Sequence, residues 1–210
     1  MDLSVIIPAY NEEKYLEKTL QAIPIGTEII VICNGCTDKT EEIAKRYANK
    51  VIVLKEKGVS HARNEGAKAA SYEKLVFLDA DIRVDERVLQ NIFESSFAIG
   101  TCHVKADSSY FFDTLAMLYK SQIHRFGYCT GLLFIDKKLF TTIGGFNETL
   151  SAGEDGQLLR KAKREQRYGV VQGYVYNNMR RYRKKGYFAI CFYWIKQSIF
   201  PSKKEYESVR

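Results

Sequence analysis

Two aspartates, Asp79 and Asp81, follow the apolar run 74–78 and are separated by a single residue. Alternate residues of an extended chain point to the same side, so both carboxylates can reach one divalent ion, or one can reach the ion and the other a sugar hydroxyl. Such a pair suits a metal ion bound to a diphosphate. The same spacing also occurs in plain turns after strands, so its meaning depends on the residues that accompany it.

These aspartates belong to a regular alternation of strands and helices. Apolar, β-branched runs alternate with segments in which apolar residues have helical spacing. The predicted elements are strands at 3–7, 28–32, 51–54 and 74–78 and helices at 14–22, 38–47 and 60–70. This order predicts an α/β fold with a mostly parallel, doubly wound central sheet flanked by helices. Ligands of such sheets bind beyond the carboxyl ends of the strands, which directs attention to segments 8–12, 33–38 and 79–81.

The second half of the chain contains another acidic pair, Glu154-Asp155. Its predicted elements are a short strand after residue 99, a helix at 110–125, an apolar run at 131–135 and a helix at 156–167. Ser151 and Glu154 have capping-box spacing, and Asp155 would lie in the first turn of the last helix. No linker rich in proline, glycine or serine separates the halves, so one continuous domain over 1–185 is expected.

Composition limits the class of protein. The 210 residues are 46% hydrophobic and 13% aromatic, which suits one folded domain and excludes a disordered chain. The net charge of +7 indicates anionic partners. Five scattered cysteines and an amino terminus without a basic flank or cleavage site predict a reduced, cytoplasmic protein. No stretch reaches the roughly 20 apolar residues of a membrane-spanning helix, so a soluble or peripheral protein is expected.

Five segments resemble, in order and spacing, the motifs of the family 2 glycosyltransferases. They are residues 5–13, 34–40, 58–67, 79–81 and 153–155. Each motif is weak alone, but together they cover roughly residues 1–185 and lie at the expected strand ends. The resemblance implies a GT-A fold, which is a Rossmann-like fold of nucleotide-diphospho-sugar transferases. It also implies a nucleotide-sugar donor and transfer with inversion at the anomeric carbon.

The resemblance implies a role for each matched segment. It makes Asp155 the general base that takes the proton of the acceptor hydroxyl, and it makes Asp81, assisted by Asp79, the ligand of Mn²⁺ or Mg²⁺. The implied donor-binding residues are Pro8, Ala9, Asn11, Glu12, Asn34, Arg63, Asp79, Ala80 and Asp81. Two of these have structural interpretations as well, because Asn11 suits a helix N-cap and Arg63 a surface arginine in a capping turn.

The base of the donor is less well defined. Many members of the family carry an acidic pair where this chain has Cys33 and Asn34, and one of those carboxylates contacts the uracil ring. The amide of Asn34 can both donate and accept hydrogen bonds, which suits uracil or guanine, so UDP- and GDP-sugars both stay open. Cys33 and Cys36 have the spacing of a zinc or redox pair, but no second cysteine pair or close histidine completes such a site.

A basic cluster at 180–185 precedes an aromatic segment, residues 186–210. Its apolar part is too short to span a bilayer and fits a helix lying at an anionic membrane surface, which would suit a lipid-linked acceptor. The alternative is that this segment folds onto the catalytic domain, with Arg180 or Arg181 near the diphosphate. The Gln-x-x-Arg-Trp signature of processive synthases does not occur in the sequence, which favours transfer of a single sugar.

Two other functions compete. A nucleotidyltransferase could use paired aspartates on a similar sheet, but it would carry a glycine-rich basic loop directly after the first strand, where this chain has Pro8-Ala9-Tyr10-Asn11. A noncatalytic, nucleic-acid-binding domain would explain the positive charge, but the sequence contains no RNA- or DNA-binding motif. We therefore expect a nucleotide-sugar donor and no nucleic-acid partner.

Overall fold

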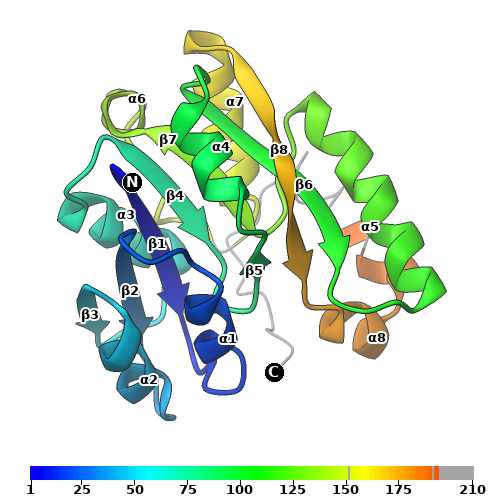
Figure 1. Cartoon of the computed structure of the whole chain (residues 1–210), viewed down its shortest axis with the longest axis horizontal. Coiled ribbons are helices and arrows are strands. Elements are labelled where there is room, and N and C mark those ends of the chain that lie inside the picture. The colour runs from blue at the N-terminus through cyan, green and yellow to red at the C-terminus, as the bar shows by residue number, and fades with distance from the viewer. Residues whose placement is uncertain (151, 191, 194–210) are drawn as a thin grey trace.

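One sheet runs through the molecule, with helices packed along it (Figure 1). The computed structural model describes residues 1–150, 152–190 and 192–193. Within these residues the strands are β1 Leu3–Ala9, β2 Glu28–Asn34, β3 Lys50–Leu54, β4 Lys74–Leu78, β5 Arg83–Val84, β6 Ile99–Ala106, β7 Leu132–Asp136 and β8 Tyr168–Asn177. The helices are α1 Leu16–Gln21, α2 Thr40–Tyr47, α3 Val59–Ala69, α4 Val88–Glu94, α5 Phe111–Ile123, η1 His124–Phe126, α6 Lys137–Thr142, α7 Glu154–Glu165 and α8 Arg180–Lys185.

The first half forms the parallel part of the sheet, in the order β3-β2-β1-β4. Its central strands β1 and β2 are buried along their whole length because both faces are covered. Val5 and Ile7 of β1 belong to one core cluster, whereas Ile6 between them belongs to another. The predicted strands and helices of this half are all present, with ends shifted by a few residues.

In the second half of the chain, the strands pair in both parallel and antiparallel directions. β7 runs antiparallel to both β4 and β6, β6 runs parallel to β8, and β8 runs antiparallel to β5. Four of the seven neighbouring pairs of the described sheet are therefore parallel, which confirms the predicted α/β class and mostly parallel sheet. Two sequence expectations need correction here. The helix predicted at 110–125 is divided into α5 and η1, and α7 begins at Glu154 rather than at residue 156.

Several elements had no counterpart in the sequence prediction. β8 was missed because its burial alternates irregularly and Gly169 and Gly173 interrupt its apolar pattern. The others are the two-residue β5 and the short helices α4, α6 and α8. The predicted segment 186–210 lies largely outside the described residues, as does Ser151, on which the predicted capping box depends. No helix in the described part of the chain has the length and apolar character needed to cross a bilayer.

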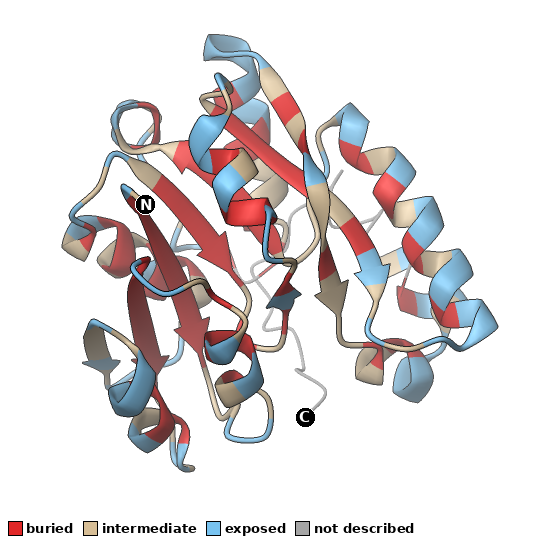
Figure 2. Ribbon diagram, in the orientation of Figure 1, coloured by how far each residue is buried: buried red, intermediate tan, exposed pale blue. Residues whose placement is uncertain are grey.

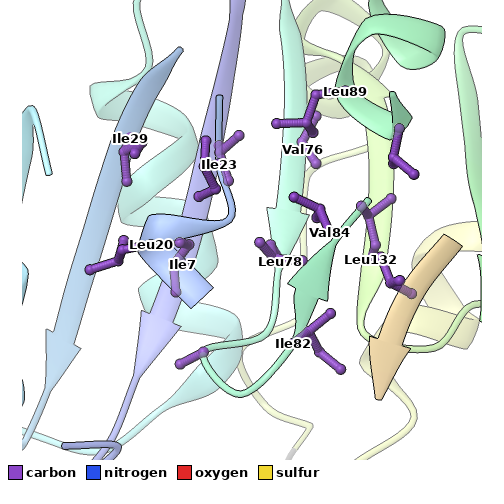
Figure 3. Close-up of a cluster of buried hydrophobic side chains, with 14 of the residues drawn as sticks. Ile7, Leu20, Ile23, Ile29, Val76, Leu78, Ile82, Val84, Leu89 and Leu132 are labelled. Carbon is purple, nitrogen blue, oxygen red and sulfur yellow. The ribbon is translucent and has the colours of Figure 1, made fainter. Parts of the chain in front are cut away.

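A core cluster supports one face of the strands that lead to the polar loops. Figure 3 shows Ile7 of β1 and Val76 and Leu78 of β4 in one cluster with Leu20 of α1 and Ile23 after it, and with Ile82, Val84 and Leu89 beyond β4. All of these side chains are less than 9% exposed. Burial of this kind contributes about 1.5–3 kcal/mol for each large aliphatic side chain. The cluster therefore holds the ends of β1 and β4, and the loops that follow them, in fixed positions.

Gly66 lets α3 lie directly on the sheet. A Cβ at this position would be 2.3 Å from Cγ2 of Ile6 and 2.7 Å from Cδ1 of Ile32, both in the buried core. We predict that Gly66→Ala lowers the free energy of unfolding by about 1–2 kcal/mol, because overpacking outweighs the gain in helix propensity of about 1 kcal/mol. Urea unfolding measures this. Lys68→Ala, exposed on the same helix, should change stability by less than about 0.5 kcal/mol. A Gly66→Ala protein at least as stable as the wild type would contradict the close approach.

A buried carboxylate, Glu28, joins the opposite ends of β1 and β2 to the segment before β4. It accepts hydrogen bonds from the hydroxyls of Ser4 and Ser71 and from the amide of Ser71, and it pairs with Lys50 at 2.9 Å. Burial alone would raise the pKa of Glu28, but these donors outweigh it and lower the pKa from 4.5 to about 2.

This shift makes stability depend on pH in a defined direction. Because the folded pKa of Glu28 is lowered, its contribution is complete above pH 4.5 and is lost as the pH falls toward 2. We predict that Glu28→Gln costs up to about 3 kcal/mol at neutral pH, and that its difference from wild type shrinks in acid. Denaturant titrations at several pH values test this, with Glu42→Gln, whose side chain is 63% exposed, as control. A difference that is constant with pH would exclude this role for Glu28.

Candidate functional site

The carboxyl ends of β1, β2 and β4 meet at one edge of the sheet. β1 lies between β2 and β4, so strand order reverses at the β1–β4 boundary, where ligands of such sheets bind. The backbone N–H of Asp79 donates to the carbonyl of Gly131 at 3.0 Å, which brings the loop before β7 to the same place. The segments singled out in the sequence are thus brought together around the first residue after β4.

Arg63 binds three acidic side chains of the site. Its Nη1 donates to Glu154 Oε1 at 2.9 Å and to Asp155 Oδ1 at 3.0 Å, and its Nη2 donates to Asp79 Oδ1 at 3.1 Å. The guanidinium also lies over the ring of Phe146, 5.1 Å from the centroid. Arg63 is buried, so the interpretation as a surface arginine is wrong. The carboxylates outweigh the effect of burial and raise the pKa of Arg63, which keeps it charged.

The two acidic residues at the start of α7 differ in exposure. The side chain of Glu154 is 11% exposed, whereas that of Asp155 is 37% exposed, although both bind the same nitrogen of Arg63. Burial raises the pKa of Asp155 to about 7, with Arg63 opposing and Glu154 and Asp79 adding to the rise. Glu154 is thus placed to hold Arg63. Asp155 can reach a solute and has a pKa suited to proton transfer near neutral pH.

A second arginine, Arg180 at the start of α8, binds the other acidic residues. Its Nη2 lies 2.8 Å from Glu12 Oε1 and 3.0 Å from Asp81 Oδ2, and its guanidinium stacks 4.3 Å over Tyr15. Burial raises the pKa of Asp81 to about 6, with Arg181 and Arg180 opposing the rise. The structure therefore joins the loop after β1, the loop after β4 and α8 through one cation.

The charges of this region suit a divalent cation. Five carboxylates, those of Glu12, Asp79, Asp81, Glu154 and Asp155, face the three guanidinium groups of Arg63, Arg180 and Arg181. The described residues contain no cluster of three or more His, Cys, Asp or Glu side chains arranged as a complete metal site. Two hard carboxylates at the end of one strand do fit Mg²⁺ or Mn²⁺ that completes its coordination with substrate phosphates.

The loops after β1 and β2 are tied together by amide side chains. Asn11, with a positive φ of 53°, accepts a hydrogen bond from the N–H of Thr37 at 2.7 Å. Asn34 donates to the carbonyl of Ala9 at 3.1 Å and accepts from the N–H of Gly58 at 3.0 Å. The N-cap expected at Asn11 is wrong, because α1 begins at Leu16 and has Tyr15 as its N-cap. Contact of Asn34 with a donor base stays a prediction.

The remaining predicted residues shape the backbone of this edge. Pro8 and Ala9 are buried in β1 opposite Ile32 and Cys33, and the carbonyl of Ala80 accepts a hydrogen bond from Thr19 at 2.9 Å. Sequence reasoning missed Phe146 and the links from Arg63 to α7 and from Glu12 to α8. Residues 91 and 168 positions apart make these links, and no local pattern reports contacts at such separations.

Comparison with known proteins assigns the chain to a family. The family model described as Glycosyl transferase family 2 matches residues 4–144, which include every strand of the parallel half and the Asp79–Asp81 pair. The chain belongs to glycosyl transferase family 2. The matched residues include Arg63, Asp79 and Asp81, whereas Glu154, Asp155 and Arg180 lie beyond them.

Two curated relatives illustrate how this family 2 chain compares. It is 37% identical over 120 residues to a dolichol-phosphate mannosyltransferase of Pyrococcus furiosus, an overlap of 50% of this chain and 34% of that protein. It is 31% identical over 200 residues to the minor teichoic acid biosynthesis protein GgaB of Bacillus subtilis, an overlap of 81% of this chain and 22% of that protein. The match thus spans about a third of one relative's length and less than a quarter of the other's.

Solved structures agree on the architecture of the family 2 chain. Residues 1–349 of Staphylococcus aureus TarS in complex with UDP-GlcNAc superpose with a TM-score of 0.69 at 23% identity, over 85% of this chain and 58% of that one. The mannosyltransferase PcManGT of Pyrobaculum calidifontis, in complex with GDP-Man and Mn²⁺, gives a TM-score of 0.64 at 21% identity, over 81% and 56%. These likenesses confirm the predicted GT-A fold.

Proposed function

We propose that this chain transfers a single sugar from a nucleotide-diphosphate sugar to an acceptor hydroxyl, with inversion at the anomeric carbon. The observation that carries the proposal is that Asp79, from the end of β4, and Asp155, from the start of α7, both bind the buried Arg63, while Asp81, two residues after Asp79, binds Arg180. This arrangement supports a diphosphate-and-metal region next to a candidate base. Residues 1–185 would form the transferase domain.

The donor would bind across the ends of β1, β2 and β4. Pro8, Ala9, Asn11, Glu12 and Asn34 lie along the side of this edge proposed for the base and ribose, and Asp79, Ala80 and Asp81 along the side proposed for the diphosphate. A UDP- or GDP-sugar is supported by the neighbouring structures, since TarS was solved with UDP-GlcNAc and PcManGT with GDP-Man.

Asp81 and Asp79 would hold Mn²⁺ or Mg²⁺ together with the donor phosphates. Such an ion, when bound, would stabilise the negative charge that develops on the leaving nucleoside diphosphate. Asp81 bonds Arg180 at 3.0 Å in the structure. Arg180 would pass from this carboxylate to a diphosphate oxygen as the donor enters, and Arg181 would add to the positive charge there. Arg63 would keep Asp79 aligned from the buried side.

Asp155 would take the proton of the acceptor hydroxyl as its oxygen attacks the anomeric carbon. A base on the face opposite the leaving group gives an inverted product. The raised pKa of Asp155 matches proton abstraction near neutral pH, and its partial exposure gives the acceptor access. The names of the Pyrococcus and Bacillus relatives support a lipid-linked or membrane-associated acceptor, which would place the protein at the cytoplasmic face of a membrane.

Product analysis tests this function. The protein would be incubated with UDP- and GDP-sugars, Mn²⁺ and panels of soluble and lipid-linked saccharide acceptors. We expect release of nucleoside diphosphate and a product whose anomeric configuration, determined by NMR, is opposite to that of the donor. A product with retained configuration would contradict the role of Asp155. Release of pyrophosphate from a nucleoside triphosphate and a sugar phosphate would instead establish a nucleotidyltransferase.

A further inference from the structure

Helix α5 exposes its apolar side to solvent. Phe111, Phe112, Leu115, Leu118 and Tyr119 are each more than half exposed. At 100° per residue these five positions fall within about 120° of the helix circumference, so they form one continuous stripe. Figure 2 shows exposed residues along the outward side of α5, at the edge of the molecule. We call these five residues the α5 stripe.

Two polar residues of α5, Asp113 and Ser121, point inward. Asp113 is fully buried and binds the side chains of Ser108, Arg183 and Tyr187. Ser121, on the same side, lies 3.0 Å from His103 Nδ1. The buried polar side chains of α5 thus have hydrogen-bond partners within the protein. The apolar stripe is left outward, and an exposed patch of this kind marks an interaction surface.

Basic residues flank the stripe and belong to the element that reaches the candidate site. Helix α8 begins with Arg180, which binds Asp81, and continues to Arg183, which pairs with Asp113 of α5. Lys184 and Lys185 are exposed at its end, and Arg125 is exposed beyond α5. Phe188 and Phe192, both strongly exposed, follow α8. The described residues of 108–128 and 180–190 include one acidic side chain, the buried Asp113.

We propose that the α5 stripe and the basic end of α8 form a surface that docks on an anionic lipid bilayer. Aromatic and aliphatic side chains would enter the headgroup region, and the basic residues would approach lipid phosphates. Charge complementarity selects this occupant over a second copy of the chain, because two such surfaces facing each other would bring like charges together. The docking itself requires neither donor nor acceptor, so it stands or falls separately from the proposed transfer reaction.

Vesicle flotation of the full chain tests the surface. The probes are vesicles of equal parts phosphatidylglycerol and phosphatidylcholine, compared with vesicles of phosphatidylcholine alone. We expect binding to the anionic vesicles that weakens with added salt. The double variant Phe111→Ser, Leu115→Ser should bind at least about tenfold less well. Lys184→Gln and Arg125→Gln should each lower binding about fivefold.

Matched controls make the result specific. Ile25→Ser removes a fully exposed apolar side chain from the loop before β2, and Lys18→Gln removes an exposed charge from α1. Both should bind vesicles as the wild type does, and circular dichroism should show the α5 variants folded. Equal binding of the α5 variants and wild type, or no binding to anionic vesicles, would overturn the proposal. Self-association of the wild type that Phe111→Ser, Leu115→Ser abolishes, without vesicle binding, would assign the surface to a second copy.

Discussion

Replacement of Asp155 by asparagine is expected to lower the rate of sugar transfer about a hundred- to ten-thousand-fold while leaving nucleotide binding intact. The amide has nearly the shape of the carboxylate and can still contact Arg63, but it cannot accept the proton of the acceptor hydroxyl. The wild-type rate should rise with pH through about 7, since the base must lose its proton to act. Steady-state rates across pH, with nucleotide affinity measured separately, check both expectations.

Glu154→Gln is the matched control, because Glu154 binds the same nitrogen of Arg63 from the neighbouring position. We expect this variant to keep its rate within about tenfold of wild type. The substitution makes one partner of Arg63 uncharged, but it leaves Asp155, the solvent-accessible proton acceptor, in place. If Glu154→Gln were the more damaging change, or if Asp155→Asn retained most of the activity, the base would have to be sought elsewhere.

Removal of the Arg63 guanidinium is expected to have the largest effect on both stability and pH dependence. Arg63→Met leaves Asp79, Glu154 and Asp155 facing each other without a cation, and breaking a buried ion pair costs about 3–5 kcal/mol. The loss should be smaller below pH 7 than above it, because protonation relieves the repulsion among the carboxylates. Any remaining activity should rise only at higher pH, since Arg63 lowers the pKa of Asp155.

Arg63→Lys separates charge from geometry. It keeps a positive charge but lacks the planar fork that joins Asp79 to α7, so we expect stability close to wild type and a reduced turnover number. Urea unfolding above and below pH 7 and the pH profile of transfer supply the readouts. A stability loss in Arg63→Met that does not change with pH would show that the carboxylates are not held ionised by this arginine.

The parallel half of the fold could be predicted because its information is local. Buried parallel strands read as nearly continuous apolar runs, and Asp79 and Asp81 directly follow one of them. The apolar run therefore predicted the strand, and the end of the strand predicted where the two aspartates lie. The second half could not be predicted to the same extent. Most residues of β8 are only partly buried, and two glycines interrupt the strand. The spacing of apolar residues located α5, but it could not show that the apolar side faces outward.

The roles within the site were only partly accessible from sequence. Asp155 and Arg63 were singled out by the motifs, but their direct contact joins residues 92 positions apart. One of the two alternatives for the carboxyl-terminal segment put Arg180 or Arg181 near the diphosphate, and the structure pairs Arg180 with Glu12 and Asp81. Such links depend on the order of the strands in the sheet, because that order decides which loops lie at the same edge. The order cannot be predicted from any single segment of the sequence.

Thermal unfolding with nucleoside diphosphates tests the central claim most directly. Wild type, Asp81→Asn and the control Asp136→Asn, altered at the opposite end of the sheet, would be heated with UDP, GDP, CDP or dTDP, with and without Mn²⁺. At a hundredfold excess over Kd, one nucleotide should raise the wild-type Tm by about 5–10 °C when Mn²⁺ is present. The rise should persist in Asp136→Asn and vanish in Asp81→Asn. Folded wild-type protein that no nucleotide stabilises would contradict a nucleotide-sugar site at the end of β4.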